Sequence, residues 1–158
     1  MGKRTWFQLT NDDTETPTIT AGAYSAGDAV GGLLTFDIIQ NHNIGGIIKS
    51  VVITDKAKQS VEFDLVLFNQ TFTPTADNAA FDVSDADLLN CVGVANIPTT
   101  AYMDFVDNSV AIVGNLFVSA KSADDNGKLY GQLITRGTPT YASTSDLQIR
   151  VIMEVDRS

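Results

Sequence analysis

Apolar and polar positions alternate most clearly at residues 47–68, whose sequence is IIKSVVITDKAKQSVEFDLVLF. Residues 51–53 are all β-branched, which favours a strand, and a polar turn follows at 55–59. After the turn, every second residue is apolar: Val61, Phe63, Leu65 and Leu67. Because side chains alternate between the two faces of a strand, this pattern predicts a second strand with one buried face. We expect the two strands to form a hairpin.

The end of this second strand is apolar on both faces, because Val66 and Phe68 interrupt the alternation. A strand that is buried on both faces needs a cover on its outer side. The chain offers two candidates for this cover. One is the later segment that carries Leu88 and Leu89, and the other is a neighbouring subunit.

Shorter strand patterns recur along the rest of the chain. We expect strands at 18–21, 33–39, 93–97, 128–136 and 147–155, and either two strands or one kinked strand within 109–121. The glycines of residues 22–32 predict bulges or tight bends. The sequence Asp124-Asp125-Asn126-Gly127 carries the Asn-Gly signal of a hairpin turn.

One short helix is predicted at 84–90, capped by Ser84 or Asp82, with acidic residues in its first turn. It falls in a long loop that crosses between strands. Eight or nine strands with one such helix are typical of an all-β antiparallel sandwich or barrel. We expect a single β domain at residues 21–158.

Residues 1–20 are predicted to form an N-terminal arm. Its first half reads as a short strand anchored by Trp6 and Phe7, and residues 11–17 (NDDTETP) read as turn and linker. The two aromatic residues either fold back onto their own sheet or dock on a neighbouring subunit. Both readings fit the sequence.

Composition narrows the classes of partner. The chain has 158 residues with 44% hydrophobic and 18% charged residues, against ~25% charged in ordinary soluble domains. The surface is therefore rich in uncharged polar residues, or part of it is buried against partners. The net charge is −9 and the pI is about 4.3, which disfavours binding to nucleic acid or to an anionic membrane.

Cellular location is only partly constrained by the sequence. Cys91 is the single cysteine, so no intrachain disulfide is expected, and its apolar neighbours predict a small buried residue. No apolar signal segment and no run of ~18 apolar residues is present. We expect a soluble protein that is synthesised in a cytoplasm.

Candidate chemistry is sparse. The one histidine, His42, falls in a polar turn, and one histidine with one cysteine cannot build the common zinc sites. Four carboxylate pairs could in principle bind calcium or act as acid and base, but turn or cap chemistry explains each more simply: Asp12/Asp13, Asp85/Asp87, Asp104/Asp107 and Asp124/Asp125. A hydrolase using such a pair is the least supported class, and we predict no catalytic residues, no metal and no cofactor.

Two tyrosines in predicted loops, Tyr24 (GAYSAG) and Tyr141 (TPTYAST), are the best candidates for an exposed sugar-binding platform. We predict that four aromatic residues take part in binding a partner: Trp6, Phe7, Tyr24 and Tyr141.

Four stretches resemble a family of small structural proteins that tailed bacteriophages encode. They are YSAGDAVGGLLTF (24–36), SVVITDKAKQSVEFDLVLF (50–68), DNAAFDVSDADLL (77–89) and LYGQLITRGTPTYASTSDLQIRVIMEV (129–155). The resemblance covers most of residues 22–155. It lies in the residue pattern and the local sequence along the chain, and it includes no catalytic motif. No functional residue is carried over from it.

The resemblance implies a β-sandwich of the jelly-roll type that is carried on the virion. Its implied role is a capsid decoration or cement protein on the outer surface of the head. The implied partners are the major capsid protein and further copies of the chain, as a trimer or a dimer. A tail or baseplate protein and a carbohydrate-binding host-attachment module remain the alternatives.

Overall fold

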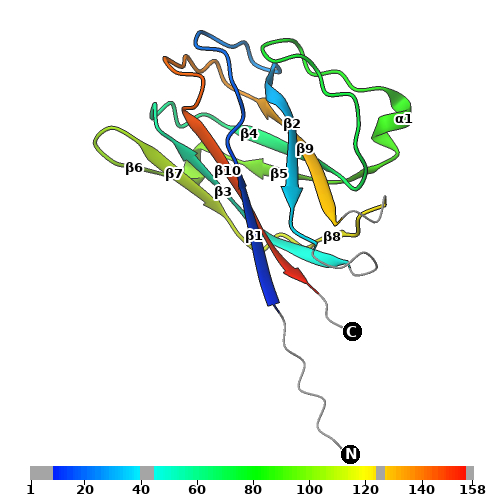
Figure 1. The fold of residues 1–158 in the computed structure, drawn as a ribbon. Helices are drawn as coiled ribbons and strands as arrows, with labels where there is room; N and C mark the ends of the chain where they lie inside the picture. Colours follow the sequence, from blue (N-terminus) through cyan, green and yellow to red (C-terminus); the bar gives the residue numbers. More distant parts are fainter. Residues whose placement is uncertain (1–8, 40–44, 124–126, 156–158) are drawn as a thin grey trace, which may run out of the picture.

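The computed structural model describes residues 9–39, 45–123 and 127–155. They form ten strands, one short α-helix and one turn of 3-10 helix, so the all-β prediction is confirmed (Figure 1). The elements are β1 (Leu9–Glu15), β2 (Ala29–Asp37), β3 (Gly46–Asp55), β4 (Phe63–Phe68), α1 (Asp85–Leu88), β5 (Cys91–Ile97), η1 (Thr99–Ala101), β6 (Tyr102–Asp104), β7 (Ser109–Val113), β8 (Val118–Ala120), β9 (Lys128–Thr135) and β10 (Leu147–Val155).

The strands make two antiparallel sheets that pack face to face. The first sheet has the order β1-β10-β3-β7-β6, with β8 also paired to β3, and the second has the order β2-β9-β4-β5. β7 and β8 pair with successive parts of β3. If these two are counted as one strand and β6 as an addition, the order is that of a jelly roll.

The expected hairpin at 47–68 is wrong in its pairing. Both strands are present, but β3 belongs to the first sheet and β4 to the second. Val51 and Ile53 of β3 and Phe63 and Leu65 of β4 face one shared core. The alternation of apolar residues determines which face of a strand is buried. Two strands that pair within a sheet and two strands that face each other across a core show the same alternation, so the pattern does not predict the pairing. The pairing expected around 124–127 fails for the same reason, because β8 and β9 also lie in different sheets; residues 124–126 themselves lie outside the described residues.

Asp55 turns the chain from the first sheet to the second. Its fully buried carboxylate accepts hydrogen bonds from the backbone N–H groups of Ala57 (3.0 Å), Gln59 (2.8 Å) and Ser60 (2.9 Å). Lys58 and Ser60 take positive φ angles of 52° and 49° to bring these donors together. Burial raises the pKa of the Asp55 carboxyl, and the three N–H bonds oppose that rise.

The core between the sheets follows the predicted alternation most closely in β10. Five inward residues of this strand are buried: Leu147, Ile149, Val151, Met153 and Val155. The bulge expected near the glycines lies in β2, where the register with β9 shifts between Val30 and Leu34. Gly31 has a φ of 73° there, and a Cβ atom on it would lie 2.5 Å from Pro17, so this position requires glycine.

Several element boundaries differ from the prediction. Residues 11–15 are part of β1 and not a turn, because they pair with β10. Residues 18–21 are not a strand, although Ile19 is buried and its N–H donates to the carbonyl of Thr144. The described part of the expected arm therefore belongs to the sandwich. The helix is confirmed in shortened form, with Ser84 as its N-cap, and 109–121 holds two strands.

Replacing Asp55 with alanine should lower the free energy of unfolding by about 3 kcal/mol, because three buried N–H donors lose their acceptor. Urea denaturation followed by fluorescence would measure the change. Asp107→Ala, at an exposed position of the β6–β7 turn, is the matched control and should stay within about 0.5 kcal/mol of the original protein. Equal stability of the two variants would contradict a structural role for the Asp55 corner.

Candidate interaction surface

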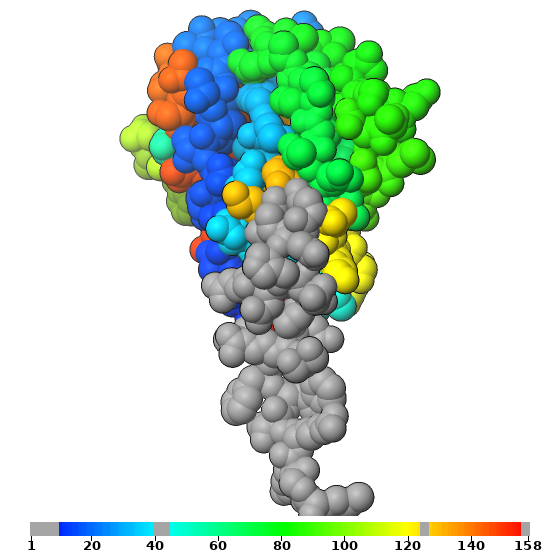
Figure 2. All heavy atoms as spheres, turned by 45° about the vertical axis from the view of Figure 1, so that its right-hand side comes forward, coloured from blue at the N-terminus to red at the C-terminus, as the bar shows by residue number. Residues whose placement is uncertain are grey.

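The outer face of the second sheet is covered by the chain itself. Residues 69–90, here called the crossing loop, connect β4 to β5 and contain α1. Figure 2 shows this segment in green on the surface of the molecule. It builds a second, smaller core against the sheet, made of Val66, Phe68, Phe72, Val83, Tyr130 and Ile134 with Leu33, Phe81 and Cys91 at its margin.

The crossing loop is thus the cover that the doubly apolar end of β4 requires. The contact is made by Phe72, whose ring centroid lies 4.1 Å from that of Phe68, together with Val83. Leu88 and Leu89, the residues expected to do this, are 47% and 87% exposed. The helix is so short that its side chains stay outside the second core.

Polar side chains hold the crossing loop in place. Gln132 of β9 is fully buried; its side-chain oxygen accepts from the N–H of Thr75, and its side-chain nitrogen donates to the carbonyls of Thr75 and Gly31. Asp77 accepts from the Tyr24 hydroxyl (2.7 Å), the Thr20 hydroxyl (2.6 Å) and the Gly31 N–H (2.6 Å). These bonds tie the loop to the segment before β2 and to the bulge in β2.

The outer face of the first sheet carries no such cover among the described residues, and we call it the open face. Antiparallel register sets Met103 beside Val110, and Ile112 beside Val52. Met103 is 64% exposed and Ile112 is 61% exposed. Further along the same face Ile47 lies opposite Ser119, next to Phe117, which is 73% exposed. Single exposed apolar residues are ordinary, but a group on one sheet face is not.

Most of the large exposed apolar side chains gather here. Of nine such residues in the described chain, six lie on the open face or at the β6–β7 turn beside it: Ile47, Met103, Phe105, Val106, Ile112 and Phe117. The β6–β7 turn forms the projecting tip at the left of Figure 1. The other three, Leu88, Leu89 and Val94, lie near α1 and on β5.

The charges of the open face are paired within it. Lys49 lies 3.4 Å from Glu154 and also 4.9 Å from the centroid of the Phe117 ring, while Arg150 lies 3.9 Å from Asp12. The crossing loop differs sharply, because it contains four acidic residues and no basic one: Asp77, Asp82, Asp85 and Asp87. The molecule therefore has an apolar, charge-balanced face on one sheet and an acidic cover on the other.

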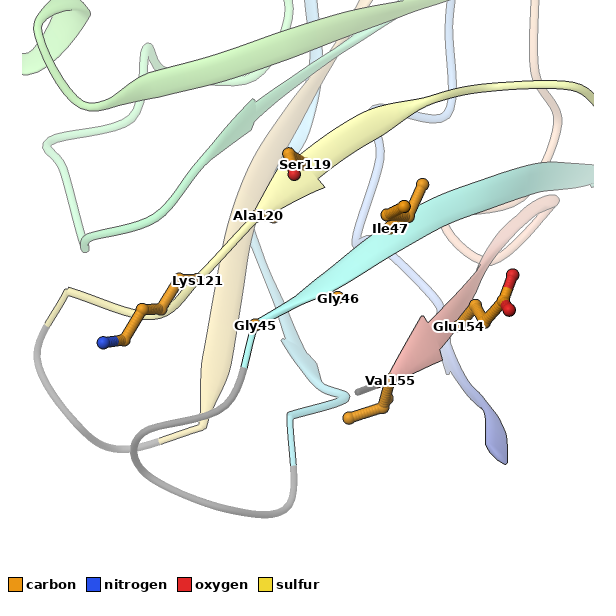
Figure 3. A pocket seen from close by; sticks show the side chains of 8 residues that line it. All are labelled: Gly45, Gly46, Ile47, Ser119, Ala120, Lys121, Glu154 and Val155. Carbon is orange, nitrogen blue, oxygen red and sulfur yellow. The ribbon is translucent and has the colours of Figure 1, made fainter. Parts of the chain in front are cut away.

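A hollow of about 530 Å³ lies at one end of the first sheet (Figure 3). Its lining consists of Gly45, Gly46, Ile47, Ser119, Ala120, Lys121, Glu154 and Val155. β3, β8 and β10 meet here, and a Cβ atom on Gly46 would lie 2.5 Å from the Glu154 carbonyl oxygen. Lys121 and Glu154 are the only ionisable side chains in this lining, and the other residues are small or apolar. The hollow is therefore a concave part of the surface without a cluster of ionisable groups.

The predicted aromatic platform is not at the surface. Tyr24 and Tyr141 are 3% and 2% exposed, and their rings pack edge to face with centroids 6.1 Å apart. Burial raises the pKa of both phenols above the ordinary range. The loops that carry the two tyrosines fold over the end of the core and bury both rings. The inference from a loop position to an exposed side chain therefore fails for Tyr24 and Tyr141. Trp6, Phe7 and His42 lie outside the described residues.

The candidate carboxylates have local structural partners. Asp13 accepts from the N–H groups of Thr14 and Asp37, and Asp104 accepts from the Ser60 hydroxyl. Asp87 accepts from the Ser84 hydroxyl at the helix cap. Within the described chain no three residues with metal-ligating side chains come together. Cys91 is a free thiol, half-buried at the edge of the second core.

The residues of the open face were missed at the sequence level, although two signals for them exist. Residues 109–113 (SVAIV) are apolar at outward as well as inward positions, and the turn that follows β6 contains Phe105 and Val106. Apolar residues in an exposed turn are the stronger signal.

Comparison with known proteins does not assign the chain to a family. No family model matches the chain, and no curated protein matches it either. No helix among the described residues is long and apolar enough to cross a membrane.

Replacing Phe72 with alanine should lower the free energy of unfolding by about 3 kcal/mol, because the second core loses its largest contribution from the crossing loop. The loop should also become a site of rapid proteolysis, which mass spectrometry of the fragments would locate. Leu89→Ala, in the same loop but 87% exposed, should change neither property. Unchanged cleavage in Phe72→Ala would show that the polar bonds alone hold the loop.

Proposed function

We propose that this chain is a non-enzymatic structural protein of a tailed-bacteriophage virion. Its specific role in this proposal is capsid decoration: homo-oligomers bind the outer surface of the major capsid protein and stabilise the head. The proposal starts from the resemblance of residues 22–155 to phage structural proteins. The structural observation that carries it further is the open face of the first sheet.

The open face has the properties of a docking surface. Several exposed apolar side chains on one sheet face are typical of protein–protein contacts, and here Met103, Ile112 and Phe117 provide them. The ion pairs Lys49–Glu154 and Arg150–Asp12 leave the face with no net charge. A partner can therefore approach the face without strong repulsion, although the whole chain carries −9.

The acidic crossing loop supports the same orientation. It lies on the opposite sheet from the open face, so it stays in solvent when the open face is occupied. Surface carboxylates at such a position favour solubility and resist binding to nucleic acid. A protein that sits on the outside of a DNA-filled shell benefits from both effects.

A non-enzymatic role is supported by what the carboxylates do. Those considered at the sequence level serve as turn acceptors or helix caps at Asp13, Asp87 and Asp104. The carbohydrate-binding alternative loses its main support because Tyr24 and Tyr141 are buried.

The decisive experiment is binding to undecorated capsids of the phage that encodes the chain. The protein should bind stoichiometrically at micromolar concentration and raise the temperature at which heads open. Ile112→Asp should weaken binding at least tenfold, because it buries an unpaired carboxylate in the contact. Its stability should be unchanged, since Ile112 is 61% exposed.

Leu89→Asp is the matched control, because it places the same charge on the crossing loop. It should bind as the original protein does. Absence of binding to capsids, or equal loss in both variants, would contradict decoration through the open face. Electron microscopy of labelled protein on whole particles would distinguish the head from the tail or baseplate.

A further inference from the structure

The β6–β7 turn carries two apolar side chains at a projecting point of the molecule (Figure 1). The turn consists of residues 105–108, in which Phe105 is 50% exposed and Val106 is 89% exposed. Side chains with this exposure contribute little to the stability of their own fold. Apolar residues at a projecting point are typical of contacts with a partner.

Two side chains from the corner between β3 and β4 hold this turn. The Lys58 ammonium donates to the carbonyl of Phe105 at 2.6 Å. The Ser60 hydroxyl donates to the Asp104 carboxylate at 2.7 Å and lies 2.9 Å from the Ser109 hydroxyl. Asp104 ends β6 and Ser109 begins β7, so these bonds fix both ends of the turn and its first residue.

The backbone of the corner is strained at the two residues that make these bonds. Lys58 and Ser60 have φ angles of 52° and 49°, which glycine adopts freely and other residues adopt at a cost. The other non-glycine residues with positive φ in the described chain are Asn78 and Asn115, and asparagine tolerates this conformation better. Glycine would keep the N–H bonds to Asp55 and relieve the strain, but it would lose the bonds to the turn. The strain therefore accompanies side chains that contact the turn.

We propose that the β6–β7 turn is the anchor of the open face and enters an apolar pocket of the protein on which this face docks. Phe105 and Val106 fill the pocket. Lys58 and Ser60 are positioning residues, since they act through the turn. A turn that is ordered before binding loses less conformational entropy when it binds. This inference rests on the docking surface proposed above, and it assigns the anchor within that surface.

The shape and charge of the turn favour a protein pocket over a membrane. A projecting turn needs a concave partner. Asp104 and Asp107 flank the two apolar residues, and Asp107 is exposed and takes part in no ion pair of the described residues. A carboxylate at this position opposes insertion into an anionic bilayer, whereas it complements a basic group at the rim of a pocket. We therefore expect an apolar pocket with a basic rim.

Nuclear magnetic resonance relaxation of the free protein tests the positioning. Lys58→Met removes the ammonium that binds the turn. Lys56→Met is the matched control, because the Lys56 ammonium binds the carbonyl of Ser145 at 3.1 Å instead. Backbone order parameters in the turn should be about 0.85 in the original protein and the control, and should fall towards about 0.6 in Lys58→Met. Both variants should unfold at the same urea concentration. A turn that is mobile in the original protein, or equally rigid in Lys58→Met, overturns the positioning.

Binding to undecorated capsids tests the anchor. Val106→Ser should weaken binding about tenfold, because the pocket loses an apolar contact. Leu89→Ser is the matched control, since Leu89 has nearly the same exposure but lies on the crossing loop, and it should bind as the original protein does. Lys58→Met should bind about threefold more weakly than Lys56→Met, because the loosened turn must be ordered on binding.

The outcomes separate this inference from the proposed function. Normal capsid binding by Val106→Ser overturns the anchor and leaves decoration through the open face intact. Absence of binding by the original protein contradicts both the decoration and the pocket, and the relaxation measurement then decides the positioning alone. Vesicles of phosphatidylcholine and phosphatidylglycerol form the last arm of the test. Binding of the original protein to these vesicles, with loss of that binding in Val106→Ser, would identify a membrane as the partner and overturn the protein pocket.

Discussion

A two-sheet sandwich has two outer faces, and the described part of this chain places a covering loop on only one of them. The crossing loop is held on the second sheet by two polar side chains: Gln132 of β9 donates to the loop carbonyl of Thr75, and Asp77 of the loop accepts from the Tyr24 hydroxyl and the Gly31 N–H. Phe72 and Val83 supply the apolar contact. Buried polar groups of this kind are costly when unpaired, so the loop has one well-defined position. Because the loop lies on the second sheet, its four carboxylates lie on that side of the molecule, and the loop leaves the outer face of the first sheet uncovered.

The same constraint explains why the two sheets differ in composition. The outer positions of β4 are apolar at Val66 and Phe68, and the loop buries them. The outer positions of β10 are Gln148, Arg150, Ile152 and Glu154, a mixture typical of a face that meets water. β7 departs from that mixture, since Val110 and Ile112 are both outward. The local excess of apolar residues at this strand distinguishes the open face from an ordinary solvated sheet, and it is the observation on which the proposed docking surface rests.

The sequence was sufficient to predict most of the strands of the core and their buried faces, because both depend on local alternation, but most of β1 was assigned to a turn and β6 was not predicted. β10 was predicted with its correct limits, and Ser84, one of the two residues expected to cap α1, is its N-cap. Pairing was not predictable in the same way, since β3 and β4 bury equivalent faces whether they pair or oppose each other. The exposure of Tyr24 and Tyr141 was also misjudged, because it depends on how loops fold over the end of the core. The open face was missed because it is defined by the absence of a cover, which only the path of residues 69–90 decides.

β1 is an edge strand of the sheet that carries the open face, and among the described strands it pairs only with β10. Thr10, Asp12 and Thr14 carry their backbone groups on the edge and their side chains on the open face. Any strand added to β1 therefore enlarges the open face instead of hiding it. Two faces held side by side bind a repetitive surface more tightly than either does alone, because the second contact is made at high effective concentration. A lattice of identical subunits is such a surface, so under the proposed function a weak contact through Met103, Ile112 and Phe117 would be sufficient for stable attachment.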